Sequence, residues 1–180
     1  MAEIASGWGA HSASQPVETP SVRTSDDLEF LREVALSINR HTLAYMADRN
    51  RRDGNPFAAE CIMASAVACQ VFPRLGVRDV EPVALELFAL SRTAYEKVID
   101  RKEITGSWWR SASPDSEVAG HIGVIVSGAL VDATAGQMAF PSSGLYAPSV
   151  VVISRESMEG RQEGQFVTLA CDGGDTYLLY

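Results

Sequence analysis

The chain has 180 residues, of which 46% are hydrophobic and 21% charged, and its formal net charge is −8. Such a composition is typical of one globular domain and not of a disordered chain. The acidic balance and the scattered basic residues exclude a nucleic-acid binder, which needs clustered lysines and arginines. No apolar run approaches the roughly 18–20 residues that span a membrane, and no secretory signal is found. We therefore expect a cytoplasmic protein.

The cysteines are Cys61, Cys69 and Cys171, an odd number at unrelated spacings. They match neither a disulfide framework nor a zinc motif. We expect reduced thiols, no metal and no cofactor.

Residues 1–23 are rich in Ala, Ser, Gly, Pro and Thr and lack a sustained periodicity, which predicts a flexible N-terminal arm. Residues 24–180 are expected to form a single domain. A first helix is predicted from Thr24 to about Asp48, because hydroxyl and acidic residues begin it and apolar residues recur every three or four positions. His41 is expected at the core edge or surface of this helix.

A second helix is predicted from Asn55-Pro56, a helix-start signal, through Phe57–Phe72. Its sequence is apolar on nearly all sides, which predicts a buried helix. Pro73 ends or kinks it and Gly76 closes it. Cys61 falls in its first or second turn.

The position of Cys61 matters because the N-terminus of a helix stabilises a thiolate, and its free amides bind a developing oxyanion. A helix that starts at Pro56 would place the thiol about one turn too deep. A regular helix that starts near Ala59 would place it well.

Residues 77–90 predict one long strand or two short ones, and the run Pro82–Leu90 suits a central strand. Ser91–Lys102 predicts a short helix. Residues 104–117 are loop-like and contain Trp108-Trp109, whose large side chains either cover the core edge or line a substrate cleft.

A β-hairpin is predicted around Ser127-Gly128. A two-residue turn there places His121 and Asp132 on the same face as diagonal neighbours, within reach of each other. Gly123 lies between them and is expected to leave room for that contact. A three-residue turn would shift the register by one and separate the pair.

Further strands are predicted at Ser149–Ser154 and in a second hairpin, Gln165–Cys171 with Thr176–Tyr180. Helices come first and antiparallel strands follow, which is an α+β pattern.

Cys61, His121 and Asp132 together suggest catalysis. A carboxylate beside one ring nitrogen orients an imidazole, whose other nitrogen can take the proton of a nucleophilic thiol. Buried cysteines are usually inert, but a charged Asp132 in an apolar strand needs a partner. Cys69 and Cys171 are predicted to be packing residues.

The cysteine near a helix start, the later Gly120-His121 and strand, and Asp132 followed by Gln137 resemble the transglutaminase-like branch of the papain-like cysteine hydrolases, in particular its small bacterial members. The resemblance covers roughly residues 57–140. It implies an α+β fold with the cysteine helix packed on an antiparallel sheet. It also implies acyl transfer through a thioester, with Cys61, His121 and Asp132 in the three catalytic roles.

Other residues extend or depart from this pattern. Gln137 and Trp109 are expected to bind substrate or to support the catalytic side chains. Glu60 stands where the family often has an aromatic or small residue, and a neighbouring carboxylate is expected to raise the pKa of the Cys61 thiol.

The leading hypothesis is a cysteine hydrolase or acyltransferase that acts on an amide bond of a peptide or protein substrate. A second hypothesis is a catalytically inactive module that binds a protein partner. A third is an enzyme like the arylamine acetyltransferases, which use acyl-CoA, although basic residues to bind the coenzyme phosphates are sparse after Cys61.

Overall fold

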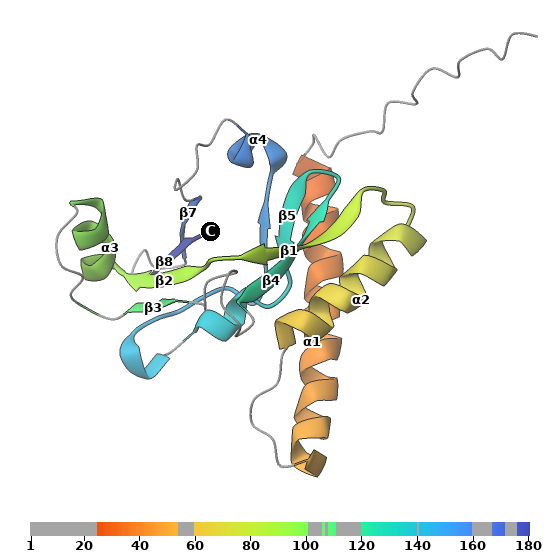
Figure 1. Cartoon of the computed structure of the whole chain (residues 1–180), viewed down its shortest axis with the longest axis horizontal. Coiled ribbons are helices and arrows are strands. Elements are labelled where there is room, and N and C mark those ends of the chain that lie inside the picture. Colours follow the sequence, from red (N-terminus) through yellow and green to blue (C-terminus); the bar gives the residue numbers. More distant parts are fainter. Residues whose placement is uncertain are drawn as a thin grey trace, which may run out of the picture.

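The computed structural model describes residues 25–53, 60–100, 106, 108–110, 120–139, 141–159, 167–171 and 176–180. Helices and two antiparallel four-stranded sheets make up this part of the chain, which confirms the α+β class (Figure 1). The arm predicted for residues 1–23 and the start signal Asn55-Pro56 lie outside the described residues.

Helix α1, Ser25–Asp53, runs beyond the predicted end at Asp48. Its buried residues recur at helical spacing and include Leu31, Ala35 and Ile38. His41 is exposed on this helix, as expected, and its Nδ1 atom lies 2.7 Å from the backbone oxygen of Ser37.

Helix α2, Glu60–Arg74, buries one face, formed by Cys61, Ala64, Ser65, Ala68 and Phe72. The prediction that this helix is buried on all sides is wrong, because 43% of the Ile62 surface is exposed. The other side of α2 faces solvent, and apolar residues there reflect helix propensity more than burial.

The end of α2 confirms the role predicted for Gly76, whereas Pro73 lies inside the helix, which continues to Arg74. Gly76 has a φ of +85°, and its N–H donates to the Pro73 oxygen at 3.1 Å. The N–H of Val77 donates to the Phe72 oxygen at 3.1 Å. These two bonds form a Schellman motif, in which glycine adopts the left-handed conformation and the last carbonyls find partners.

The first sheet has the order β1-β4-β5-β6. Its strands are β1 (Val80–Leu85), β4 (His121–Val126), β5 (Ala129–Asp132) and β6 (Val151–Ile153), and each pair is antiparallel. The strand predicted at Ser149–Ser154 is thus confirmed as β6. Residues of β5 are buried on both faces, so this strand lies within the core.

The second sheet has the order β3-β2-β8-β7. Its strands are β2 (Phe88–Ser91), β3 (Trp108–Arg110), β7 (Thr168–Ala170) and β8 (Thr176–Leu179). The pairing of β7 with β8 confirms the second predicted hairpin.

Two expectations about strands are wrong. Pro82–Leu90 is not one central strand, because the chain leaves the first sheet after Leu85 and enters the second at Phe88; the alternative of two short strands in residues 77–90 is confirmed. Pro82 lies in β1, at the edge of its sheet, where a missing N–H is tolerated. Trp108-Trp109 belongs to strand β3 and not to a loop, and the backbone of Trp109 pairs with Ala89.

The shorter elements are helix α3 (Arg92–Ile99), the 3-10 helices η1 (Ala135–Met138) and η2 (Pro141–Ser143), and helix α4 (Arg155–Met158). Helix α3 confirms the helix predicted in residues 91–102, and the Ser91 hydroxyl accepts a hydrogen bond from the Ala94 amide at its start. Helix α4 follows Ser154, whose hydroxyl accepts a hydrogen bond from the Ser157 amide.

The first sheet separates two cores. One face packs against α1 and α2 through residues such as Val124, Val131 and the fully buried Phe72. The opposite face packs against the second sheet through residues such as Leu130 and Leu178. Figure 1 shows α1 and α2 together beside β1, β4 and β5, with α3 at the far end of the second sheet. Among the described residues, no helix is long and apolar enough to cross a membrane.

Candidate functional site

The turn between β4 and β5 sets the register of the site. Val126 pairs with Ala129 and Ile125 with Leu130, as the two-residue turn predicted. Ser127 and Gly128 have φ angles of 48° and 86°, the left-handed values of a type I′ turn. The turn is anchored by Ser127, whose N–H donates to the Asp79 oxygen and whose hydroxyl donates to the Arg78 oxygen, both at 3.0 Å.

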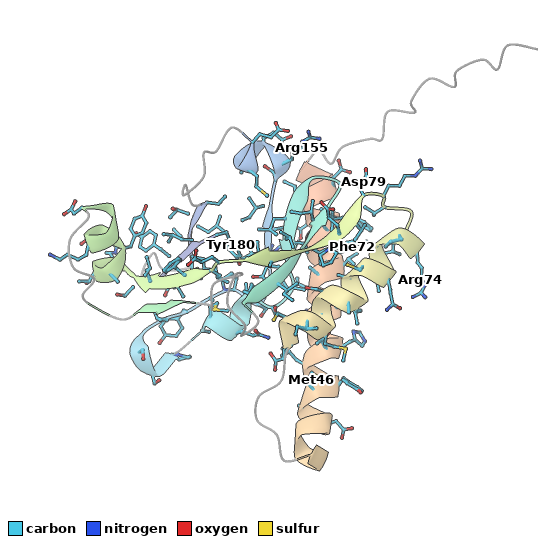
Figure 2. All side chains as sticks on the ribbon, in the orientation of Figure 1. Met46, Phe72, Arg74, Asp79, Arg155 and Tyr180 are labelled. Carbon is cyan, nitrogen blue, oxygen red and sulfur yellow. The ribbon has the colours of Figure 1, made fainter. Side chains whose placement is uncertain are left out.

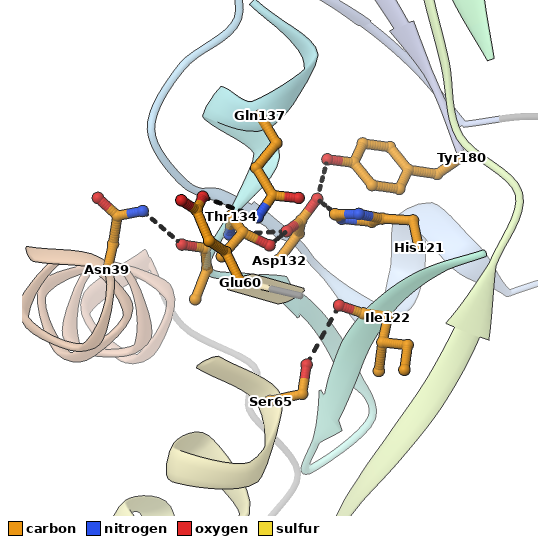
Figure 3. Close-up of polar contacts among 10 residues, drawn as sticks. Asn39, Glu60, Ser65, His121, Ile122, Asp132, Thr134, Gln137 and Tyr180 are labelled. Carbon is orange, nitrogen blue, oxygen red and sulfur yellow. Dashed lines mark hydrogen bonds and ion pairs between the residues drawn. The ribbon is translucent and has the colours of Figure 1, made fainter. Parts of the chain in front are cut away.

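This register brings His121 and Asp132 together. Nε2 of His121 lies 2.8 Å from Oδ2 of Asp132 (Figure 3). The His121 side chain is 2% exposed and that of Asp132 is 0% exposed, so water screens the pair little. A buried carboxylate next to an imidazole favours the protonated ring.

Gly123 does not make room for this contact, contrary to expectation. A β-carbon at Gly123 would lie 2.8 Å from Cδ1 of Leu85 and 3.1 Å from Cδ1 of Leu130. Glycine is therefore needed there for the approach of apolar side chains from β1 and β5. The hairpin pattern alone does not reveal this, because Leu85 belongs to a strand that pairs from far along the chain.

Asp132 accepts hydrogen bonds from three residues. Its Oδ1 atom accepts from the Thr134 amide at 2.8 Å and from the Thr134 hydroxyl at 3.3 Å. Its Oδ2 atom accepts from the Tyr180 hydroxyl at 2.8 Å as well as contacting His121. Four contacts on two oxygens hold the carboxylate in one orientation and compensate for its burial.

The backbone after Asp132 is tied to α1. Nδ2 of the buried Asn39 donates to the Ala133 oxygen at 2.7 Å. This bond fixes the segment that carries the Thr134 amide. Asn39 thus supports the site from a distant part of the chain.

Cys61 is the second residue of α2 and is only 9% exposed. A hydrogen bond with the His121 side chain is among the causes that lower the pKa of its thiol. Because Nε2 of His121 faces Asp132, Nδ1 is the ring nitrogen available to the thiol. The Ser65 hydroxyl, one turn further along α2, donates to the Ile122 oxygen at 3.1 Å and holds α2 against β4.

The surroundings of Cys61 and His121 shift their pKa values in opposite directions. Burial raises the pKa of Cys61, but the hydrogen bond and charge of His121 and the amides of Ile122 and Ile62 outweigh it, so the pKa falls below 9.0. Burial lowers the pKa of His121, but Asp132 and Cys61 outweigh it and raise the pKa to about 9. The two shifts favour a thiolate beside an imidazolium.

The pKa of the Cys61 thiol is lowered from 9.0 despite the neighbouring Glu60. The Glu60 carboxylate is not among the groups that shift the pKa of Cys61. Its Oε2 atom instead accepts a hydrogen bond from Nε2 of Gln137 at 2.9 Å. Gln137 lies on η1, just beyond the hairpin, and so links that segment to the first turn of α2, beside the nucleophile.

Cys69 and Cys171 are half-buried and pack against apolar clusters, in line with the packing role predicted for them. Burial raises the pKa of the Cys69 thiol, in contrast to Cys61. The side chain of Trp109 lies outside what the structure describes, so its suggested role stays a prediction.

The sequence analysis did not identify Thr134 or Tyr180. Thr134 had a recognisable signal, because an aspartate often accepts a hydrogen bond from the amide two residues later. Tyr180 had none, since it reaches Asp132 from the other sheet.

Among the described residues, no group of three or more histidine, cysteine or acidic side chains could hold a metal ion. Compared with protein-family models, with curated proteins and with solved structures, the chain matches none.

Proposed function

We propose that this protein is a cysteine-dependent hydrolase or acyltransferase that acts on an amide bond of a peptide or protein through a thioester. The observation that carries the proposal is the 2.8 Å contact of the buried His121 with Asp132, combined with the opposite pKa shifts that His121 and the buried Cys61 cause in each other. In such an arrangement the carboxylate orients the ring, and the ring activates the thiol.

The reaction follows from these positions. The Cys61 thiolate attacks the carbonyl carbon, a C–S bond forms, and the carbonyl oxygen gains the negative charge. The imidazolium of His121 then donates its proton to the leaving nitrogen, the C–N bond breaks and a thioester remains. Water or an acceptor amine attacks the thioester while His121 takes the proton, and the thiolate leaves.

Backbone amides are available to stabilise the negative charge. The N–H groups of Ile62 and Ile122 both interact with the Cys61 sulfur. The first amides of a helix have no intrahelical acceptor, so that of Ile62 can turn to an oxyanion. These donors come from α2 and β4, the two elements that meet at the thiol.

The arrangement of elements also supports a papain-like or transglutaminase-like core. The helix that carries the cysteine packs on β4, which carries the histidine, and the adjacent β5 carries the aspartate. The lowered pKa of the Cys61 thiol also favours the enzyme over the rival hypothesis of an inactive binding module, in which the thiol needs no activation.

The test is formation of an acyl-enzyme. Wild-type protein treated with p-nitrophenyl acetate at neutral pH should gain one acetyl group, located at Cys61 by peptide mass spectrometry. Cys61→Ser and His121→Ala variants, checked for folding by circular dichroism, should gain none there. Cys69, on the same helix, is the internal control. Equal acetylation of Cys61 and Cys69 would contradict the proposal.

A further inference from the structure

Tyr180 is held firmly next to the site by its backbone. Its N–H donates to the Val167 oxygen at 3.1 Å, and its own oxygen accepts from the Val167 N–H at 2.9 Å. Figure 2 shows the side chain in the space between the two sheets. Tyr180 directly follows β8, so it brings a group from the second sheet to the hairpin of the first.

The hydroxyl of Tyr180 shares its acceptor with the histidine. It donates to Oδ2 of Asp132 at 2.8 Å, the same atom that contacts Nε2 of His121 at 2.8 Å. Figure 3 shows both contacts converging on one oxygen. Burial, and then the negative charge of Asp132, raise the pKa of Tyr180 well above 10.0, so its hydroxyl keeps its proton and remains a donor.

We propose that Tyr180 is a positioning residue that fixes the Asp132 carboxylate and limits how strongly Oδ2 holds the proton of His121. This inference deepens the proposed function and rests on it.

The effect follows from competition for one oxygen. A hydrogen bond from the hydroxyl withdraws charge from Oδ2, so less charge remains to hold the His121 proton. An imidazolium held less strongly gives its proton more readily to a leaving nitrogen. The Thr134 contacts cannot have the same direct effect, because they lie on Oδ1.

Within the described part of the chain, few ionisable groups act on His121 and Tyr180. Cys61 reaches His121 from α2, and Asp132 reaches it from β5. Cys171, beyond β7, is the other titratable group that acts on Tyr180. Glu60, also in the first turn of α2, is bound to Gln137.

The experiment is an NMR titration of the histidine ring in the full-length chain. A Cys61→Ser background removes the titrating thiol, and His121→Ala assigns the signal among only three histidines. In Tyr180→Phe the pKa of His121 should rise by about 1, the size expected when a charge-assisted hydrogen bond is lost. Tyr177→Phe removes a hydroxyl from the same strand without a contact to Asp132 and should leave the pKa unchanged.

An unchanged or lower pKa in Tyr180→Phe would overturn the inference. If that variant does not fold, protein made with 3-fluorotyrosine provides the opposite test, because the more acidic phenol is a stronger donor and should lower the pKa of His121. A rise or no change there would also overturn it.

The titration needs no turnover, so it separates this inference from the proposed function. If Cys61 forms no acyl-enzyme but the pKa of His121 responds to Tyr180, the function fails and the coupling stands. If an acyl-enzyme forms and the pKa does not respond, only the role of Tyr180 fails.

Discussion

Nε2 of His121 and Oδ2 of Asp132 lie 2.8 Å apart, and neither side chain exposes more than 2% of its surface. Two strands joined by a two-residue turn produce this contact, so the pair is built by local structure. The thiol of Cys61 completes the arrangement. It belongs to a helix that begins at Glu60, 61 positions before His121. Each prediction below tests one link in this arrangement.

The first prediction concerns the pH dependence of alkylation. Since the pKa of Cys61 is lowered below 9.0 and that of Cys69 is raised, iodoacetamide should label Cys61 at lower pH than Cys69. In His121→Ala the hydrogen bond and charge of His121 are lost while burial and the amides of Ile122 and Ile62 remain, so the onset for Cys61 should move to higher pH. Labelling rates at both cysteines, measured by peptide mass spectrometry from pH 5 to 10, check this. Identical profiles for the two thiols would contradict it.

Asp132→Asn should slow alkylation of Cys61 at neutral pH by about 100-fold, because an amide in place of the carboxylate neither stabilises the imidazolium nor fixes the tautomer. Asp79→Asn is the control, since it removes the same charge at an exposed position. Circular dichroism shows whether the variant is folded. A folded Asp132→Asn protein that is alkylated as fast as Asp79→Asn would rule out a role for the carboxylate.

Glu60→Gln should leave the alkylation profile of Cys61 unchanged. The carboxylate is not among the groups that shift the thiol pKa, and glutamine keeps an oxygen that can accept from Nε2 of Gln137. The measurement is the midpoint pH of Cys61 labelling in the variant and the wild type. A clear shift of the midpoint to lower pH would mean that Glu60 does oppose the thiolate.

Asn39→Ala should lower the free energy of unfolding by about 1–3 kcal/mol, because the buried Ala133 oxygen loses its donor. Urea unfolding followed by circular dichroism gives the value. Ser37→Ala, at an exposed position of the same helix, should change stability by less than about 0.5 kcal/mol. Equal losses in the two variants would show that the Asn39 bond contributes nothing specific.

Local patterns in the sequence account for much of the site. The Ser127-Gly128 turn sets the register of β4 with β5 and so determines which of their residues share a face, and the contact of His121 with Asp132 followed from the residues alone. The helix closure at Gly76 was equally local. Such features depend on neighbours within a few positions.

Features that depend on distant segments were not predictable. Whether residues 82–90 form one strand or two depends on which sheets accept them, and both halves are apolar enough for either arrangement. The contacts of Tyr180 and Asn39 with the hairpin join parts of the chain that no spacing rule connects. The role of Gly123 was misread for the same reason, because Leu85 comes from another strand.

The nucleophile and its base come from separate elements, and this has a consequence for the newly made chain. Before α2 packs on β4, Cys61 has neither the imidazolium nor the Ile122 amide beside it, and its thiol has the ordinary pKa near 9.0. A thiol in that state is mostly protonated and reacts slowly with oxidants at neutral pH. The reactivity of the thiol therefore arises only where the helix lies against β4 and brings Cys61 to His121 and the Ile122 amide.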